Sequence, residues 1–135
     1  MSENPKVLLI DDDLLPTQYY YYALRVKNFD VEHCLEADLA RDKWKEFKPD
    51  LVVLDMMMPP GIRVEAQKTK EGLHSGLLLY EWLRRDFPLT PVVVLTHLLS
   101  AGALFPKDAH LRIVQKAHLP PTQLPVLAEE MLRKP

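Results

Sequence analysis

Short apolar runs alternate with helical patterns along the 135-residue chain. The third run shows no apolar–polar alternation, which is typical of a strand buried on both faces of a parallel sheet. Strands that alternate with helices predict a doubly wound α/β fold with right-handed crossovers and helices on both faces. The runs that predict strands are Val7–Ile10, Val31–Leu35, Leu51–Leu54, Pro91–Leu95 and Leu111–Val114.

Four stripes of apolar residues at helical spacing mark the helix faces that normally pack on a sheet. The first stripe crosses four consecutive tyrosines, which cannot all point the same way, so some should be buried and others exposed. The stripes are Leu15, Tyr19, Tyr22, Ala23 and Val26; Ala37, Ala40, Trp44 and Phe47; Leu79, Trp82, Leu83 and Phe87; and Leu124, Leu127, Ala128 and Met131.

Two segments fit the alternation poorly. Residues 60–75 are polar and contain glycines, which predicts an extended loop after the third strand and a mobile flap. Between the fourth and fifth strands, Gly102 and Pro106 predict a helix that is short or irregular.

Length and composition predict one ordinary domain over residues 1–135, with no effector domain after the last helix. A net charge of −2 gives no indication of a nucleic-acid or membrane surface. The single cysteine, Cys34, cannot form an internal disulfide, and no signal peptide or membrane span is evident, so we expect a cytoplasmic protein.

Polar residues follow the predicted strands at their carboxyl ends, which meet at one edge of a parallel sheet. Each of these residues alone could be a helix cap or a solvated surface charge. Together, however, they include several carboxylates at one edge, which would repel one another unless a cation neutralised them. Oxygen ligands of this charge suit Mg²⁺, and a lysine and a hydroxyl could hold phosphoryl oxygens. The sequence therefore predicts a Mg²⁺-dependent phosphoryl site containing Asp11, Asp12, Asp13, Asp55, Thr96 and Lys116.

The segments LLIDDD, PDLVVLDMMMP, VVVLTH and IVQK, in this order and spacing, resemble the receiver domains of two-component response regulators. The resemblance spans nearly the whole chain. It implies a flavodoxin-like (βα)5 sheet with strand order 2-1-3-4-5. It also implies that the chain accepts a phosphoryl group from a sensor histidine kinase or a phosphotransfer protein and signals to a downstream protein that the sequence does not identify.

By this resemblance Asp55 is the phosphoacceptor. Asp12, Asp55 and the Met57 carbonyl would bind Mg²⁺ directly, and Asp11 would act through a water molecule. Thr96 corresponds to the switch hydroxyl and Lys116 to the lysine that pairs with the phosphoryl group. Such a protein has at most self-phosphorylation and self-dephosphorylation activity.

The chain departs from the family pattern around the site. Family members usually have a glycine about eight residues after the phosphoacceptor, where the third helix opens. Here the corresponding glycine is Gly76, much farther from Asp55, so the 60–75 segment is an insertion. His97 replaces a small residue, and we expect it to shield the site rather than act as a base. Ile113 replaces an aromatic residue and Ala117 a proline, so we expect a trans Lys116–Ala117 bond and an output that does not use the usual threonine–aromatic coupling.

Two alternatives remain open from the sequence. The chain could be a pseudo-receiver that binds partners without phosphorylation. It could also be a phosphatase of the haloacid dehalogenase type, which would use Asp11 and Asp13 but would leave Asp55 unexplained.

Overall fold

The computed structural model describes residues 4–56, 75–97 and 101–133. Its centre is a sheet of five parallel strands in the order β2-β1-β3-β4-β5. This topology confirms the predicted flavodoxin-like fold, and each strand lies within about one residue of its predicted position. The strands are β1 (Lys6–Ile10), β2 (Asp30–Cys34), β3 (Leu51–Asp55), β4 (Val92–Thr96) and β5 (Leu111–Gln115).

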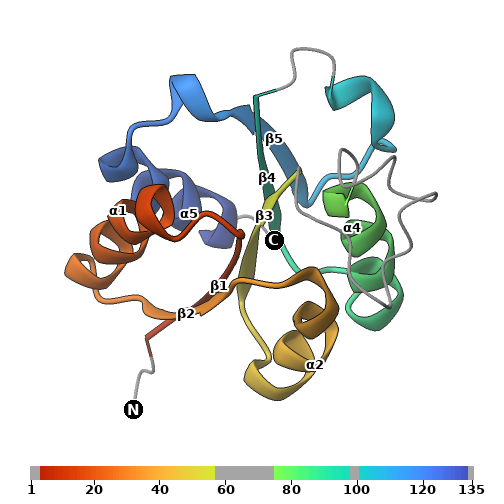
Figure 1. Cartoon of the computed structure of the whole chain (residues 1–135), viewed down its shortest axis with the longest axis horizontal. Coiled ribbons are helices and arrows are strands. Elements are labelled where there is room, and N and C mark those ends of the chain that lie inside the picture. Colours follow the sequence, from red (N-terminus) through yellow and green to blue (C-terminus); the bar gives the residue numbers. More distant parts are fainter. Residues whose placement is uncertain (1–3, 57–74, 98–100, 134–135) are drawn as a thin grey trace.

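Helices cover both faces of the sheet (Figure 1). On one face lie α1 (Leu14–Val26) and α5 (Leu124–Arg133), and on the other lie α2 (Ala37–Phe47) and α4 (Ser75–Asp86). Short 3-10 turns occur at η1 (Ala101–Leu104), η2 (Lys116–His118) and η3 (Pro121–Gln123). Within the described ranges, no helix has both the length and the apolar character needed to cross a membrane.

The core consists of two apolar layers separated by the sheet. β3 and β4 are buried along their whole length, as expected for central strands of a parallel sheet. The predicted stripes on α2, α4 and α5 are confirmed, because Trp44, Leu83 and Leu124, one from each stripe, are fully buried. Cys34 is also buried, as expected for a small core residue.

The prediction of which face of α1 is buried is wrong. The buried residues of the helix are Thr17, Tyr20 and Leu24, whereas Leu15 and Tyr22 of the predicted stripe are exposed. Two residues of the buried face carry hydroxyl groups, and both hydroxyls are hydrogen-bonded. The Thr17 hydroxyl donates to the Asp13 carbonyl and the Tyr20 hydroxyl to the Leu119 carbonyl. Polar atoms paired in this way can be buried at low cost.

The segment between β4 and β5 is irregular, as predicted. In its described part the helical residues are those of η1, and Arg84 of α4 holds the chain that follows. The Arg84 guanidinium donates to the Asp108 carboxylate at 2.6 Å and to the carbonyls of Thr90 and His110 at 2.6 and 3.1 Å. Tyr80 donates its hydroxyl to the same carboxylate. These contacts fix the start of β5 against α4.

A second ion pair joins the two helices on this face. The Asp86 carboxylate of α4 accepts two hydrogen bonds from Arg41 of α2, both at 2.9 Å, and one from the Trp44 indole at 2.8 Å. The Arg41 hydrogen bonds are the main reason that the pKa of Asp86 falls from its ordinary 3.8 to about 2.

The predicted extended loop and flap at 60–75 lie outside the described residues except for Ser75, which is buried at the start of α4.

Candidate functional site

Polar side chains meet at the carboxyl edge of the sheet. Asp11 follows β1, Asp55 is the last residue of β3, and Thr96 is the last residue of β4. Lys116 follows β5 and begins η2. Parallel pairing of β1 with β3, β3 with β4, and β4 with β5 brings these strand ends together. Asp11, Asp55 and Thr96 are all buried, so their polar atoms are held by the fold rather than by solvent.

Three carboxylates form a cluster at this edge. One oxygen each from Asp11, Asp12 and Asp55 lies within 4.8 Å of the others. Asp11 and Asp55 are buried and Asp12 is exposed at the rim. Desolvation, followed by the negative charge of Asp11, raises the pKa of Asp12. The cluster therefore has an excess of negative charge.

Lys116 lies between two members of the cluster. Its Nζ is 3.2 Å from Asp11 Oδ2 and 3.5 Å from Asp55 Oδ1. Desolvation alone would lower the pKa of Lys116, but the attraction of Asp55 and Asp11 outweighs it, and the pKa is raised. The lysine is thus a cation at neutral pH. It offsets one of the three negative charges.

Backbone groups hold Asp11 in place. The Asp13 amide donates to Asp11 Oδ1 at 2.9 Å, and the Asp11 amide donates to the Cys34 carbonyl at 3.0 Å. His33 Nε2 lies 3.0 Å from the Asp11 carbonyl oxygen, to which it donates. Our sequence reasoning missed His33, because no motif marks it. Only the pairing of β1 with β2 would have placed it beside Asp11.

Gly76 lies directly against the end of β3. A Cβ at this position would be 2.7 Å from the Asp55 carbonyl oxygen and 2.7 Å from Met56 Cα. The Gly76 amide donates to the Met56 carbonyl at 2.9 Å. The predicted glycine at the start of the helix is therefore the residue that allows α4 to approach the site so closely.

The other predicted residues occupy different environments. Met57 lies outside the described residues. His97 and Ala117 are exposed. Ile113 is half-buried and packs against the core beneath α2 and α4. Since no peptide bond in the described parts of the chain is cis, the Lys116–Ala117 bond is trans, as predicted.

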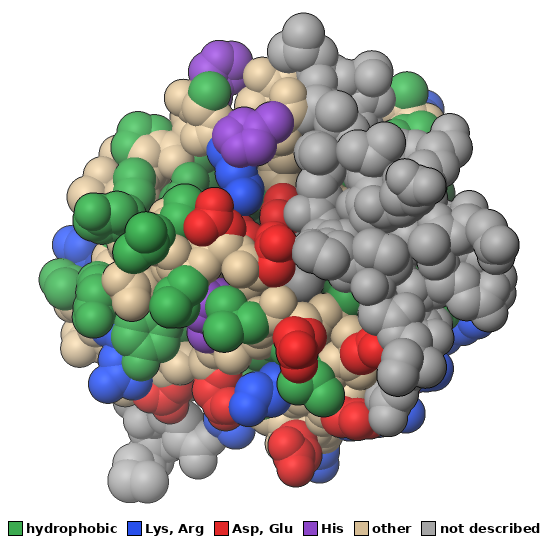
Figure 2. Space-filling model, in the orientation of Figure 1, with side chains coloured by type: hydrophobic (Ala, Val, Ile, Leu, Met, Phe, Trp, Pro, Cys, Tyr) green, Lys and Arg blue, Asp and Glu red, His purple; other side chains and the backbone are tan. Residues whose placement is uncertain are grey.

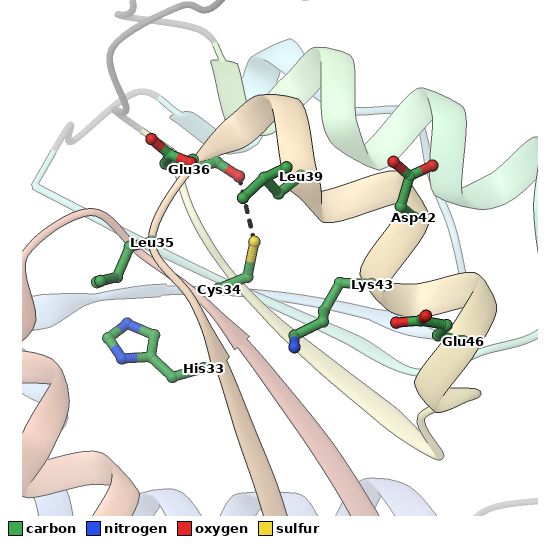
Figure 3. A pocket seen from close by; sticks show the side chains of 8 residues that line it. All are labelled: His33, Cys34, Leu35, Glu36, Leu39, Asp42, Lys43 and Glu46. Carbon is green, nitrogen blue, oxygen red and sulfur yellow. Dashed lines mark hydrogen bonds between the residues drawn. The ribbon is translucent and has the colours of Figure 1, made fainter.

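A separate hollow of about 460 Å³ lies between the end of β2 and α2 (Figure 3). His33 and Lys43 line it together with three carboxylates, and the Cys34 thiol donates to the Glu36 carbonyl at 3.1 Å. Burial raises the pKa of this thiol, so the sulfur is neutral and poorly nucleophilic at neutral pH. The hollow is distinct from the carboxylate cluster.

Comparison with known proteins places this arrangement in a family. Residues 7–104 match the response regulator receiver domain. The chain is 33% identical over 78 residues to the alkaline phosphatase synthesis transcriptional regulatory protein PhoP of Bacillus subtilis, a match that covers 56% of this chain and 32% of PhoP. The chain thus spans about a third of the length of that relative.

Solved structures share the fold. A CheY-like receiver domain protein from Methanospirillum hungatei superimposes with a TM-score of 0.77 at 18% identity, covering 96% of this chain and 94% of that chain. The BeF3-activated receiver domain of Klebsiella pneumoniae RstA gives a TM-score of 0.72 at 24% identity, with coverages of 96% and 99%. The matched family, the strand order and the acidic cluster agree, and the chain belongs to the response regulator receiver domain family of two-component systems.

Proposed function

We propose that Asp55 is the phosphoacceptor of this receiver domain and that Mg²⁺ binds beside it. The observation that carries the proposal is the position of the Lys116 ammonium, which contacts Asp11 and Asp55 within a cluster of three carboxylates. Three carboxylates and one ammonium have a formal charge of −2, which a single divalent cation would balance.

The donor set fits Mg²⁺ in chemistry. All three side chains offer oxygen ligands, and Mg²⁺ is usually held by one or two carboxylates together with water and phosphoryl oxygens. Asp12 and Asp55 would hold the ion, and Asp11 would act through a water molecule. The Met57 carbonyl completes this proposed set. When bound, the ion neutralises charge on the incoming phosphoryl group.

The residues of the chain then have separate tasks. An Asp55 oxygen forms the new P–O bond while the P–N bond of a phosphohistidine breaks and its electron pair stays on nitrogen. Lys116 holds one phosphoryl oxygen by a charge-assisted hydrogen bond. The Thr96 hydroxyl, at the end of the neighbouring β4, would contact another. The exposed His97 shields the group from solvent.

The donor we propose is a sensor histidine kinase or a phosphotransfer protein. The downstream partner is a protein that reads the phosphorylated state. We further propose that residues 1–135 form a single receiver domain. The haloacid dehalogenase alternative has no support in the site, because Asp13 is outside the cluster and Asp55 is within it.

Incubation with acetyl phosphate and Mg²⁺, followed by intact-mass and peptide analysis, tests the assignment. We expect one phosphoryl group on Asp55, and none after Asp55→Asn. The matched control is Asp13→Asn, an exposed carboxylate next to the cluster, which should still be labelled. Labelling of Asp11, or no labelling of the wild-type protein, would contradict the proposal and favour a phosphatase or a pseudo-receiver, respectively.

A further inference from the structure

His33 reaches the carboxylate cluster from the edge of the sheet. It lies on β2, one residue before the strand ends at Cys34, and β2 is paired with β1 alone in the described sheet. Figure 3 shows the His33 ring and the Cys34 thiol leaving β2 in different directions, as neighbouring residues of a strand do. The His33 ring therefore shares a face with Val31, which packs in the apolar layer beneath α1 and α5.

The His33 ring supplies a hydrogen-bond donor that the backbone does not. Its Nε2 lies 3.0 Å from the Asp11 carbonyl oxygen, and because a carbonyl can only accept, the ring nitrogen is the donor. The ladder between β1 and β2 ends just before this point, at the hydrogen bond from the Asp11 amide to the Cys34 carbonyl. In the described ranges, no backbone amide donates to the Asp11 carbonyl. Since Asp11 is buried, loss of the ring donor would leave this carbonyl poorly satisfied.

The direction of the Asp11 carbonyl helps to determine where Asp12 lies. The carbonyl of Asp11 and the amide of Asp12 belong to one planar peptide unit, so holding the oxygen also sets the rotation of the unit that leads into Asp12. Asp12 is exposed at the rim, and among the described residues no other residue donates a hydrogen bond to its carboxylate. Figure 2 shows acidic side chains on this surface, over the carboxyl end of β1. The placement of the Asp12 carboxylate therefore depends on its backbone.

Asp11 itself is held by contacts that do not involve His33. Its carboxylate accepts a hydrogen bond from the Asp13 amide at 2.9 Å and one from Lys116 Nζ at 3.2 Å. These contacts fix the Asp11 side chain from two sides. Loss of the His33 donor should therefore leave the Asp11 carboxylate in place and release chiefly Asp12.

We propose that His33 is a positioning residue for the metal site, because by holding the Asp11 carbonyl it directs the Asp12 carboxylate toward the ion. This inference rests on the proposed function, in which Asp12 and Asp55 hold Mg²⁺. Mg²⁺ requires nearly octahedral ligands at about 2.0–2.1 Å, so a small displacement of one ligand lowers the affinity. Hydrogen-bond partners that orient metal ligands typically contribute about 10–100-fold to metal affinity.

Calorimetric titration of the full chain with Mg²⁺ measures this effect. His33→Leu has no donor and should raise the Kd for Mg²⁺ about tenfold, the low end of the usual range, because His33 acts through the backbone. His33→Gln keeps an N–H donor at a similar reach and should restore a Kd close to that of the wild type. Glu32→Leu is the matched control on the same strand: it removes the 3.0 Å ion pair with Lys43 and should leave the Kd unchanged.

Two further measurements separate positioning from a purely structural role. Urea unfolding in EDTA measures how far each variant is destabilised without metal. A loss of stability in His33→Leu with an unchanged Kd would show that the ring only satisfies a buried carbonyl. At saturating Mg²⁺, the rate at which acetyl phosphate labels Asp55 in His33→Leu should be close to the wild-type rate, because Asp55, Thr96 and Lys116 are unaltered. A slow rate at saturation would place the defect in the phosphoryl site instead and contradict the inference.

The outcomes distinguish this inference from the proposed function. Equal Kd values for the wild type and His33→Leu, an equally raised Kd in His33→Gln, or a raised Kd in Glu32→Leu would overturn the role of His33 and leave the metal site standing. A wild-type protein that binds no Mg²⁺ would overturn the metal site and this inference with it. If His33→Leu does not fold, His33→Val takes its place, since β-branched residues suit a strand.

Discussion

Replacing Gly76 with alanine should destabilise the protein although the residue lies in a helix. In a free helix, Gly→Ala is stabilising by about 0.5–1 kcal/mol. Here the added Cβ would lie 2.7 Å from the Asp55 carbonyl oxygen and from Met56 Cα, where ordinary contacts begin at 3.4 Å. Both obstacles are backbone atoms of β3 and the residue after it, so neither can rotate away as a side chain could.

The helix must therefore shift by several tenths of an ångström. Overpacking of this kind costs about 1–3 kcal/mol, which exceeds the gain in helix propensity. We expect a net loss of roughly 1–2 kcal/mol, or about 4–8 °C in Tm for a domain of this size. Because the clash is with Asp55 itself, we also expect slower labelling by acetyl phosphate.

Gly102→Ala is the matched control, since a Cβ there would meet no atom within 4 Å. It should leave the stability unchanged or slightly raised, and labelling normal. Urea and thermal unfolding of the two variants beside the wild type measure the difference. The reasoning fails if Gly76→Ala is as stable as the wild type, or if both variants lose the same free energy.

Other parts of the structure make further predictions. Lys116→Met removes the only ammonium contacting the cluster in the described structure, so Mg²⁺ should raise its Tm more than that of the wild type; an equal response would contradict the charge argument. Arg41 lowers the pKa of Asp86 to about 2. The ionised Asp86 therefore contributes its full stabilisation of the folded state above about pH 4, and this contribution is lost as the pH falls toward 2. Wild type and Asp86→Asn should therefore differ by roughly 1–2 kcal/mol in urea unfolding near neutral pH and converge in acid. Arg84→Met should lower the free energy of unfolding by about 2–4 kcal/mol, because it leaves the Asp108 carboxylate without its partner. Arg85→Met, at the exposed neighbouring position, should change it very little, and urea unfolding of the two variants measures the contrast.

The sheet and the position of the site could be predicted from the sequence because both depend on simple patterns. An uninterrupted apolar run such as Leu51–Leu54, short and rich in β-branched residues, is typical of a buried parallel strand. Once the strands are parallel, their carboxyl ends must meet, and Asp11, Asp55 and Lys116 come together without further information.

The packing of α1 and the support of the site depend on contacts that no local pattern encodes. The buried face of α1 includes Tyr20, whose hydroxyl donates to the Leu119 carbonyl, a partner 99 residues away, and Leu24, which packs in the core. His33 beside Asp11 depends on the register of β2 against β1. Nearly every position of α1 that was not needed for this packing is also apolar, so counting apolar residues selected the wrong face.

The contacts of Lys116 bear on where a change at the site can be transmitted. β5 is an edge strand, paired with β4 alone in the described sheet, and Arg84 holds the backbone carbonyl of His110 immediately before it. Moving the start of β5 would require breaking the Arg84 contacts. The other end of the strand leads from Lys116 to Leu119, whose carbonyl accepts the Tyr20 hydroxyl at 2.8 Å. If phosphorylation of Asp55 moves Lys116, we expect the movement to reach α1 through Leu119 rather than the start of β5, which Arg84 holds.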